Sequence, residues 1–138
     1  MAKRVVCDTN VLISGYLWKG ATRRLLDLIR TGQQWTLLSS SDTMNEFIRV
    51  LAYKKFGLTP AEIEPLVADL RQRSVFVHVR SKLHIIQDDP TDNIFLNLAV
   101  DGKAELLVSG DRHLLDLKAF RGLPIVGVRS FLRIAAVS

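Results

Sequence analysis

The stretch Arg4-Val5-Val6-Cys7-Asp8-Thr9-Asn10, residues 4–10, places a carboxylate directly after a short apolar run. Valine is β-branched and favours strands, so residues 4–7 are expected to form a strand of the core. Asp8 then interrupts the apolar run at the point where the chain is expected to turn from strand to helix. The segment therefore predicts a core strand with an acidic side chain at its carboxyl end.

The same order, a short apolar run followed by a segment of helical period, recurs along the chain. Strands are expected at residues 4–7, 35–38, 75–79, 106–108 and 125–128. Helices are expected at residues 22–30, 42–53, 60–73, 92–100, 112–118 and 130–136. The alternation predicts an α/β protein with a mainly parallel central sheet and helices on both of its faces.

One of these helices has a well-marked start. Thr59 offers a capping hydroxyl, Pro60 suits the first turn, and Glu62 stands three residues after the cap, which is the pattern of a capping box. The helix expected at residues 60–73 is therefore the one whose beginning the sequence fixes best.

The length and composition of the chain limit its organisation. With 138 residues, of which 48% are hydrophobic, the chain can bury one sizeable core, so a single domain over residues 1–138 is expected. No apolar stretch is long enough to span a bilayer, and Asp8 cuts the first apolar run before a secretory signal could form. A soluble, cytoplasmic protein without a membrane partner is expected.

The charge balance and the single cysteine point to a class of partner and a compartment. Nineteen Lys and Arg against fourteen Asp and Glu give a formal charge of +5, which suits a polyanionic partner or, equally, a solvated basic surface. Cys7, the only cysteine, cannot form an internal disulfide. Its place within a strand disfavours a role as nucleophile, because burial raises the pKa of a thiol.

Acidic residues also follow or precede other expected elements. Asp111 follows the strand at 106–108, and the group Asp88-Asp89-Pro90-Thr91-Asp92-Asn93 comes just before the helix expected at 92–100. Ligands of open α/β sheets bind beyond the carboxyl ends of the strands, so these carboxylates and Asp8 are expected to line one crevice.

The same residues have a purely structural interpretation. Aspartate is a favoured helix N-cap, so Asp111 can cap the helix expected at 112–118. Asp89 or Thr91 can likewise cap the helix expected at 92–100. The residues alone leave the binding and the capping interpretations open.

Three motifs of this chain, in order, resemble those of the PIN domain family. The run Val6-Cys7-Asp8-Thr9-Asn10-Val11-Leu12-Ile13-Ser14 looks like the opening motif of the family. Residues 89–93 and 109–115 are similar to its later acidic motifs, and the resemblance runs from about Val5 to Val128. It implies a PIN-like fold and a metal-dependent nuclease, similar to the VapC-type toxins of toxin–antitoxin pairs, which cut RNA.

The resemblance also implies which residues act. Position by position, Asp8, Glu46, Asp92 and Asp111 match the catalytic, metal-binding acids of the family. Two polar residues, Asn10 and Ser109, match supporting positions beside the first and last of these acids, and Asp89 matches a further acid of many relatives.

Two of the positions raise questions of their own. Glu46 lies on a helix whose apolar stripe is formed by Met44, Phe47, Ile48 and Leu51, and it is expected roughly opposite that stripe, as a surface residue would be. Many relatives carry another acid where this chain has His113. This departure argues against a second metal ion more than against a first.

Carboxylates suit the implied reaction because hard cations such as Mg²⁺ and Mn²⁺ prefer their oxygens and can neutralise a phosphodiester. The expected cofactor is therefore Mg²⁺ or Mn²⁺, and the expected substrate is RNA, single-stranded or in loops rather than in duplexes. The toxin-type resemblance further implies a small antitoxin partner and a homodimer.

Other functions fit the sequence less well. A catalytically inactive PIN fold that binds RNA or protein is the main alternative, and the intact acidic set argues against it. A haloacid-dehalogenase-type phosphatase needs a second aspartate where this chain has Asn10. His78, His84 and His113 lack the spacing of zinc ligands and are expected at the surface or in packing, and the Gly-rich phosphate loops of nucleotide-cofactor enzymes are absent.

Overall fold

The strand that begins the sequence lies inside a six-stranded sheet, in the computed structural model, which describes residues 2–31, 33–87 and 89–137. The order is β3-β2-β1-β4-β6-β5. The strands are β1 (Lys3–Cys7), β2 (Trp35–Ser39), β3 (Ser74–Phe76), β4 (Leu106–Val108), β5 (Ala119–Phe120) and β6 (Leu123–Val126). All neighbouring strands are parallel except β5 and β6, which run antiparallel.

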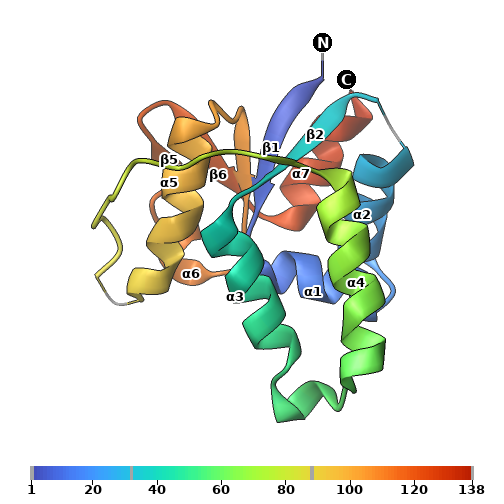
Figure 1. Cartoon of the computed structure of the whole chain (residues 1–138). Helices are drawn as coiled ribbons and strands as arrows, with labels where there is room; N and C mark the ends of the chain where they lie inside the picture. Colours follow the sequence, from blue (N-terminus) through green and yellow to red (C-terminus); the bar gives the residue numbers. More distant parts are fainter. Residues whose placement is uncertain (1, 32, 88, 138) are drawn as a thin grey trace.

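Helices cover both faces of this sheet, as the alternation of strands and helices predicted (Figure 1). On one side pack α1 (Thr9–Leu17), α2 (Ala21–Thr31), α3 (Ser41–Leu51), α4 (Pro60–Arg73) and α7 (Val128–Ala136). On the other pack α5 (Asn93–Asp101) and α6 (Arg112–Leu115). Successive side chains of a strand point to opposite faces, so Val5 and Cys7 join the first core and Val6 joins the second.

Two short 3-10 helices complete the described elements. They are η1 (Lys54–Phe56), between α3 and α4, and η2 (Pro90–Asp92), directly before α5. Within the ranges that the structure describes, none of the helices has the length and apolar character needed to cross a membrane.

The helix with the best-marked start has the predicted bounds. Thr59 caps α4 by accepting a hydrogen bond from the Glu62 amide at 3.2 Å, and the Glu62 carboxylate accepts one from the Thr59 amide at 3.0 Å. Both halves of the capping box are thus present, as the sequence predicted.

Helix α1 and strand β5 were not predicted, for two different physical reasons. No helix was predicted at α1, because its polar and apolar residues do not separate onto two faces and carry no clear helical period. The helix expected at residues 112–118 ends at Leu115, because the chain turns through Lys118 at φ 59° and enters β5, which pairs with β6.

Strand β3 is shorter than the predicted 75–79, because the segment after it finds other partners. Residues 77–87 run along α5, where three polar side chains at four-residue intervals share one face of the helix. Asp101 accepts hydrogen bonds from the amides of residues 80 and 81, at 2.6 and 2.8 Å, and Asn97 accepts one from the amide of residue 83 at 2.8 Å. Asn93 completes the row, so α5 guides this segment to the loop before η2.

Candidate functional site

The site is built at the carboxyl ends of β1 and β4, which lie side by side in register. Cys7 of β1 pairs with Val108 of β4, and the amide of Asp8 donates to the Val108 carbonyl at 3.0 Å. The next residue of each strand, Asp8 and Ser109, therefore stands at the same edge of the sheet, as the rule for open α/β sheets predicts.

Asp8 is buried and held by hydrogen bonds on both carboxylate oxygens. Its Oδ1 accepts from the amide of Val11 at 2.9 Å, which caps α1. Its Oδ2 accepts from the Ser109 hydroxyl and from the amide of Gly110 at 3.1 Å. Asp8 is thus both a helix cap and a fixed member of the site, so the two interpretations of its sequence position are compatible.

Ser109 connects the two strand-end aspartates. Its hydroxyl donates to Asp8 and accepts from the amide of Asp111 at 2.8 Å, and its side chain is fully buried. Asp111 in turn caps α6 by accepting from the amide of His113 at 2.7 Å through Oδ1. Ser109 therefore lies behind the acidic side chains and sets their relative positions.

Asp92, at the junction of η2 and α5, brings the third carboxylate to the same place. Its neighbour Asn93 fixes the backbone there, accepting from the amides of Ile85 and Ile86 and donating to the carbonyls of Ile86 and Pro90, all at 2.9 to 3.0 Å. The Asp92 Oδ2 is buried and has no hydrogen-bond partner within the described parts of the chain. A buried carboxylate oxygen without a donor calls for a cation or a proton.

The electrostatics of the aspartates agree with this geometry. Burial, joined by repulsion from Asp111 and Asp89, raises the pKa of Asp92 to about 7. Burial also raises the pKa of Asp8, although the bonds from Ser109, Val11 and Gly110 oppose that shift. Without a cation, the site therefore favours uptake of a proton.

The predicted site residues surround one pocket of about 240 Å³. Six of the seven line it, namely Asp8, Asn10, Glu46, Asp89, Asp92 and Asp111, and the seventh, Ser109, is the buried residue behind them. Asp88, from the same acidic group of the sequence, lies outside the described residues. The polar lining also includes Thr9, whose Oγ1 is buried and finds no partner in the described chain.

Glu46 occupies a place that the helical stripe did not predict. The expectation of a position opposite the apolar stripe is wrong, because Thr43 and Val50 are also buried and widen the packed face of α3. Glu46 lies at the edge of that face, and its side chain is only 11% exposed. It accepts a hydrogen bond from the guanidinium of Arg49, one turn further along the helix.

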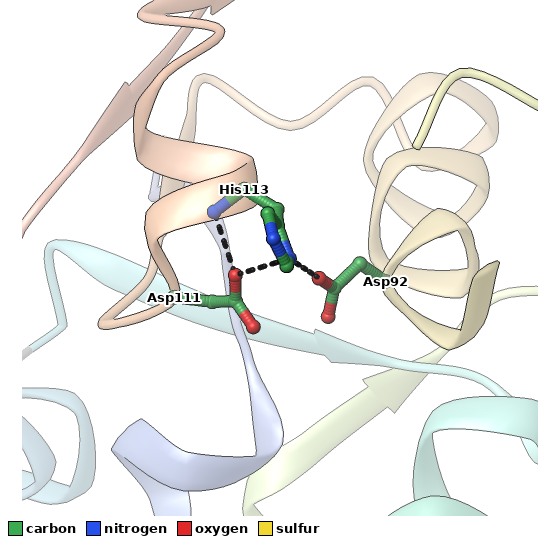
Figure 2. A group of neighbouring side chains, drawn as sticks. All are labelled: Asp92, Asp111 and His113. Carbon is green, nitrogen blue, oxygen red and sulfur yellow. Dashed lines mark hydrogen bonds and ion pairs between the residues drawn. The ribbon is translucent and has the colours of Figure 1, made fainter. Parts of the chain in front are cut away.

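His113 is the residue whose place the sequence missed. Its Nδ1 lies 3.5 Å from Asp111 Oδ1 and 4.0 Å from Asp92 Oδ2. Figure 2 shows the imidazole beside both carboxylates. Ligand atoms of these three residues all lie within 4.8 Å of one another, which suits a metal ion. The departure from the family pattern at this position was the available signal, and the structure places a further potential ligand there.

Basic and aromatic residues form the wall of the pocket on the side of α3. Arg49 and Lys55 are the cations among the described lining residues, and Tyr53 lies between them in the sequence. Cys7, by contrast, is buried in the sheet, and burial raises the pKa of its thiol, which agrees with a packing role.

Comparisons with known proteins agree with this architecture. A family model described as PIN domain matches residues 4–113. Among solved structures, one chain of VapBC2 from Rickettsia felis, determined bound to a DNA fragment from their promoter, is similar with a TM-score of 0.62 and 14% identity. The match covers 90% of this chain and 98% of that chain, and at this identity it concerns the fold. Among curated proteins, no sequence matches this chain.

Proposed function

Since this chain belongs to the PIN domain family, we propose that it is a Mg²⁺- or Mn²⁺-dependent endoribonuclease, the toxin of a toxin–antitoxin pair. The observation that carries the proposal is the meeting of five acidic side chains in one pocket, where a buried oxygen of Asp92 has no donor among the described residues. Such crowding of carboxylates destabilises a protein unless a cation or a proton relieves it.

The residues present fit a hard divalent cation. The pocket offers carboxylate oxygens from separate elements, with Asp8 from the end of β1, Asp92 from η2 and Asp111 from the start of α6. Mg²⁺ and Mn²⁺ prefer such oxygens and keep several waters, for which the unpartnered Thr9 hydroxyl provides a further contact. The chemistry that the ion supplies is neutralisation of the phosphate charge and activation of the attacking water.

The residues of the pocket have different roles in this proposal. Asp8 has a fixed orientation, because three hydrogen bonds hold its two oxygens. Asp111 accepts the His113 amide and contacts the His113 ring through Oδ1, so the start of α6 holds this carboxylate at the pocket. Ser109 is a positioning residue, because it touches both aspartates from behind and does not line the pocket. Glu46 and Asp89 complete the negative lining.

The test is cleavage of mixed single-stranded RNA by the purified full chain, with Mg²⁺ or Mn²⁺ and with EDTA. We expect metal-dependent cleavage that EDTA abolishes, and the Asp111→Asn variant prepared in parallel should be inactive. Equal cleavage by this variant would assign the activity to a contaminating nuclease. No cleavage with either metal, on any RNA, would favour the alternative of an inactive PIN fold.

Two partners belong to the same proposal. The toxin-type assignment implies a small antitoxin that covers the acidic pocket and a homodimer of the chain, and it sets the reaction in the cytoplasm. The dimer is tested by light scattering of the purified chain at micromolar concentration, where a monomer alone would contradict it. The antitoxin is tested by coexpression with the product of a neighbouring gene and recovery of an inactive complex.

A further inference from the structure

We propose that five residues, Arg49, Tyr53, Lys55, Phe56 and Trp18, form a binding track for single-stranded RNA that leads away from the acidic pocket. We call this surface the aromatic–basic ridge. The identity of its ligand rests on the proposed function, because the strand that it holds is the one cut in the pocket.

The ridge is continuous with the pocket through side-chain contacts. Arg49, Tyr53 and Lys55 line the pocket itself. Outward from there, the Lys55 ammonium lies 5.1 Å from the centroid of the Phe56 ring, and that ring lies 5.9 Å from the ring of Trp18. Cations and aromatic rings therefore follow one another from the carboxylates to the end of α1.

The exposed rings of the ridge are held in place. Tyr53 is 40% exposed, yet its hydroxyl accepts a hydrogen bond from Arg49 Nη1 at 2.6 Å, and the same guanidinium lies 5.6 Å from the ring centroid. Trp18 is 52% exposed and leans on Phe56, which itself packs against the core. Because these rings are already positioned, a base that stacks on them loses less freedom on binding.

The spacing of residues along α3 connects the ridge with the acidic pocket. Glu46, Arg49, Val50 and Tyr53 recur at intervals of three and four residues, so they follow one face of the helix and its end. Tyr53 stands seven residues after Glu46, roughly 10 Å further along the helix axis. An RNA strand with one phosphate at the carboxylates therefore passes Tyr53 with a neighbouring nucleotide.

Charge and chemistry favour RNA over a protein as the occupant. The charged residues of the ridge, Arg49 and Lys55, are both cations, and they stand beside a pocket that repels polyanions. Surfaces that bind single strands combine such cations, which hold the backbone, with rings on which bases stack. The chain as a whole carries a formal charge of +5, which draws an RNA strand toward it.

The protein carries its own probe for the test. Of its two tryptophans, Trp18 is exposed on the ridge, whereas Trp35 of β2 is buried, 5% exposed, against Phe131 of α7. The full chain in EDTA, at low ionic strength, is titrated with an oligouridylate of about ten nucleotides. We expect the RNA to quench the emission of Trp18, and the Trp18→Leu variant, which retains Trp35, to show no quenching.

Affinity of the variants is measured by polarisation of a labelled copy of the same RNA. We expect Tyr53→Ala and Trp18→Leu to bind at least about tenfold more weakly, which corresponds to about 1.4 kcal/mol. Tyr53→Phe, which keeps the ring, should bind as wild type. Lys55→Gln should lower the slope of log affinity against log salt by about 0.7.

The matched control is Phe76→Ala, which removes a ring that is 49% exposed on the edge strand β3, away from the ridge. It should bind RNA as wild type. Equal affinity of wild type, Tyr53→Ala and Trp18→Leu, each with an unchanged melting temperature, would overturn the track even if the protein cuts RNA.

Failure of the nuclease proposal gives a different result. Intact binding to the ridge without cleavage in any metal would remove the ribonuclease assignment and leave the track standing. Ridge variants that dissociate a homodimer in light scattering, with RNA affinity unchanged, would identify the ridge as a protein interface and overturn the inference.

Discussion

Asp92 and Asp101 stand at the two ends of the same helix, α5, and they differ in burial, in hydrogen-bond partners and in the direction of their pKa shifts. Asp92 is buried beside other carboxylates, and one of its oxygens has no hydrogen-bond partner among the described residues. Asp101 is more exposed and accepts hydrogen bonds from the Ser81 hydroxyl and from the amides of Ser81 and Arg80. The pKa of Asp92 is raised to about 7, whereas that of Asp101 is lowered by these donors.

The contrast separates a carboxylate whose hydrogen-bond partners come from the protein from one that lacks them among the described residues. Two aspartates nine positions apart on one helix look alike in a sequence, and both lie next to a helix end. The carboxylate of Asp101 accepts hydrogen bonds from residues 80 and 81, so donors of the protein itself stabilise its charge. Asp92 has like charges where Asp101 has donors, so its environment is completed only by a cation or a proton.

The largest expected effect that separates the two ends of α5 is on RNA cleavage. Asp92→Asn, like Asp8→Asn and Asp111→Asn, should lower kcat/KM at least about a thousandfold, or about 4 kcal/mol of transition-state stabilisation. Asp101→Asn should stay within about threefold of wild type and lose only about 1 kcal/mol of folding stability, because an amide replaces an acceptor of several hydrogen bonds. The measurement is cleavage of a fluorogenic RNA beside urea unfolding; an active Asp92→Asn enzyme would contradict the site.

Metal should also distinguish the two aspartates, through stability rather than activity. Binding of Mn²⁺ to the folded state alone raises the free energy of unfolding of the wild-type chain by about 2.7 kcal/mol at a hundredfold excess over the dissociation constant. Asp92→Asn should lose most of this gain, and Asp101→Asn should keep it. Melting curves of the three proteins with and without Mn²⁺ measure it. A wild type whose melting ignores metal at concentrations that support cleavage would contradict the carboxylate site.

The pH dependence of metal-free stability should have opposite signs at the two ends. The raised pKa of Asp92 makes its ionisation unfavourable in the folded state, so its penalty begins above the unfolded pKa of about 4 and grows until about pH 7. Asp92→Asn should therefore become more stable than wild type across that window, by on the order of 2 kcal/mol once solvent screening is allowed for. Above about pH 7 the difference should stay constant.

Asp101 should behave in the reverse way. Its lowered pKa means that its ionised form stabilises the fold above the unfolded pKa, and that this contribution is lost as pH falls through the folded value. Relative to Asp101→Asn, the wild type should therefore gain stability as the pH rises from acid. Unfolding in urea from pH 3 to pH 8, in the presence of EDTA, gives both slopes in one series. Parallel curves for the two variants would show that the contrast between the two aspartates is unimportant.

The smallest expected effect concerns His113, which adds an imidazole to Asp92 and Asp111. Imidazole suits transition metals more than Mg²⁺, so the wild-type site should prefer Mn²⁺ more strongly than a carboxylate-only site does. His113→Asp should reduce the ratio of Mn²⁺ to Mg²⁺ affinity several-fold, or about 1 kcal/mol. Calorimetric titration with each metal measures the ratio, and His84→Asp, a change at an exposed histidine, is the control. An unchanged ratio would remove His113 from the ligands.

Local sequence patterns predicted the elements whose formation depends on residues that are neighbours in the chain. The start of α4 follows from Thr59, Pro60 and Glu62, which act within one turn, and the core strands follow from short β-branched or apolar runs. The carboxyl-edge rule then located Asp8 and Asp111 correctly at one side of the sheet. The mainly parallel sheet with helices on both faces is confirmed, while the catalytic roles of the acidic residues stay predictions.

Tertiary structure alone decided what surrounds each of these residues. The hydroxyl that holds Asp8 comes from Ser109, which lies 101 positions further along the chain, so no local pattern predicts this hydrogen bond. Glu46 lines the pocket because it lies at the edge of the packed face of α3, which includes the buried Thr43 and Val50, and β5 forms because it pairs with β6. The sequence alone therefore determined the succession of most strands, helices and strand-end acids along the chain, because that succession depends on local backbone preference and on the period of apolar residues. Which acid is satisfied and which needs a cation depends on donors and charges that only folding brings together.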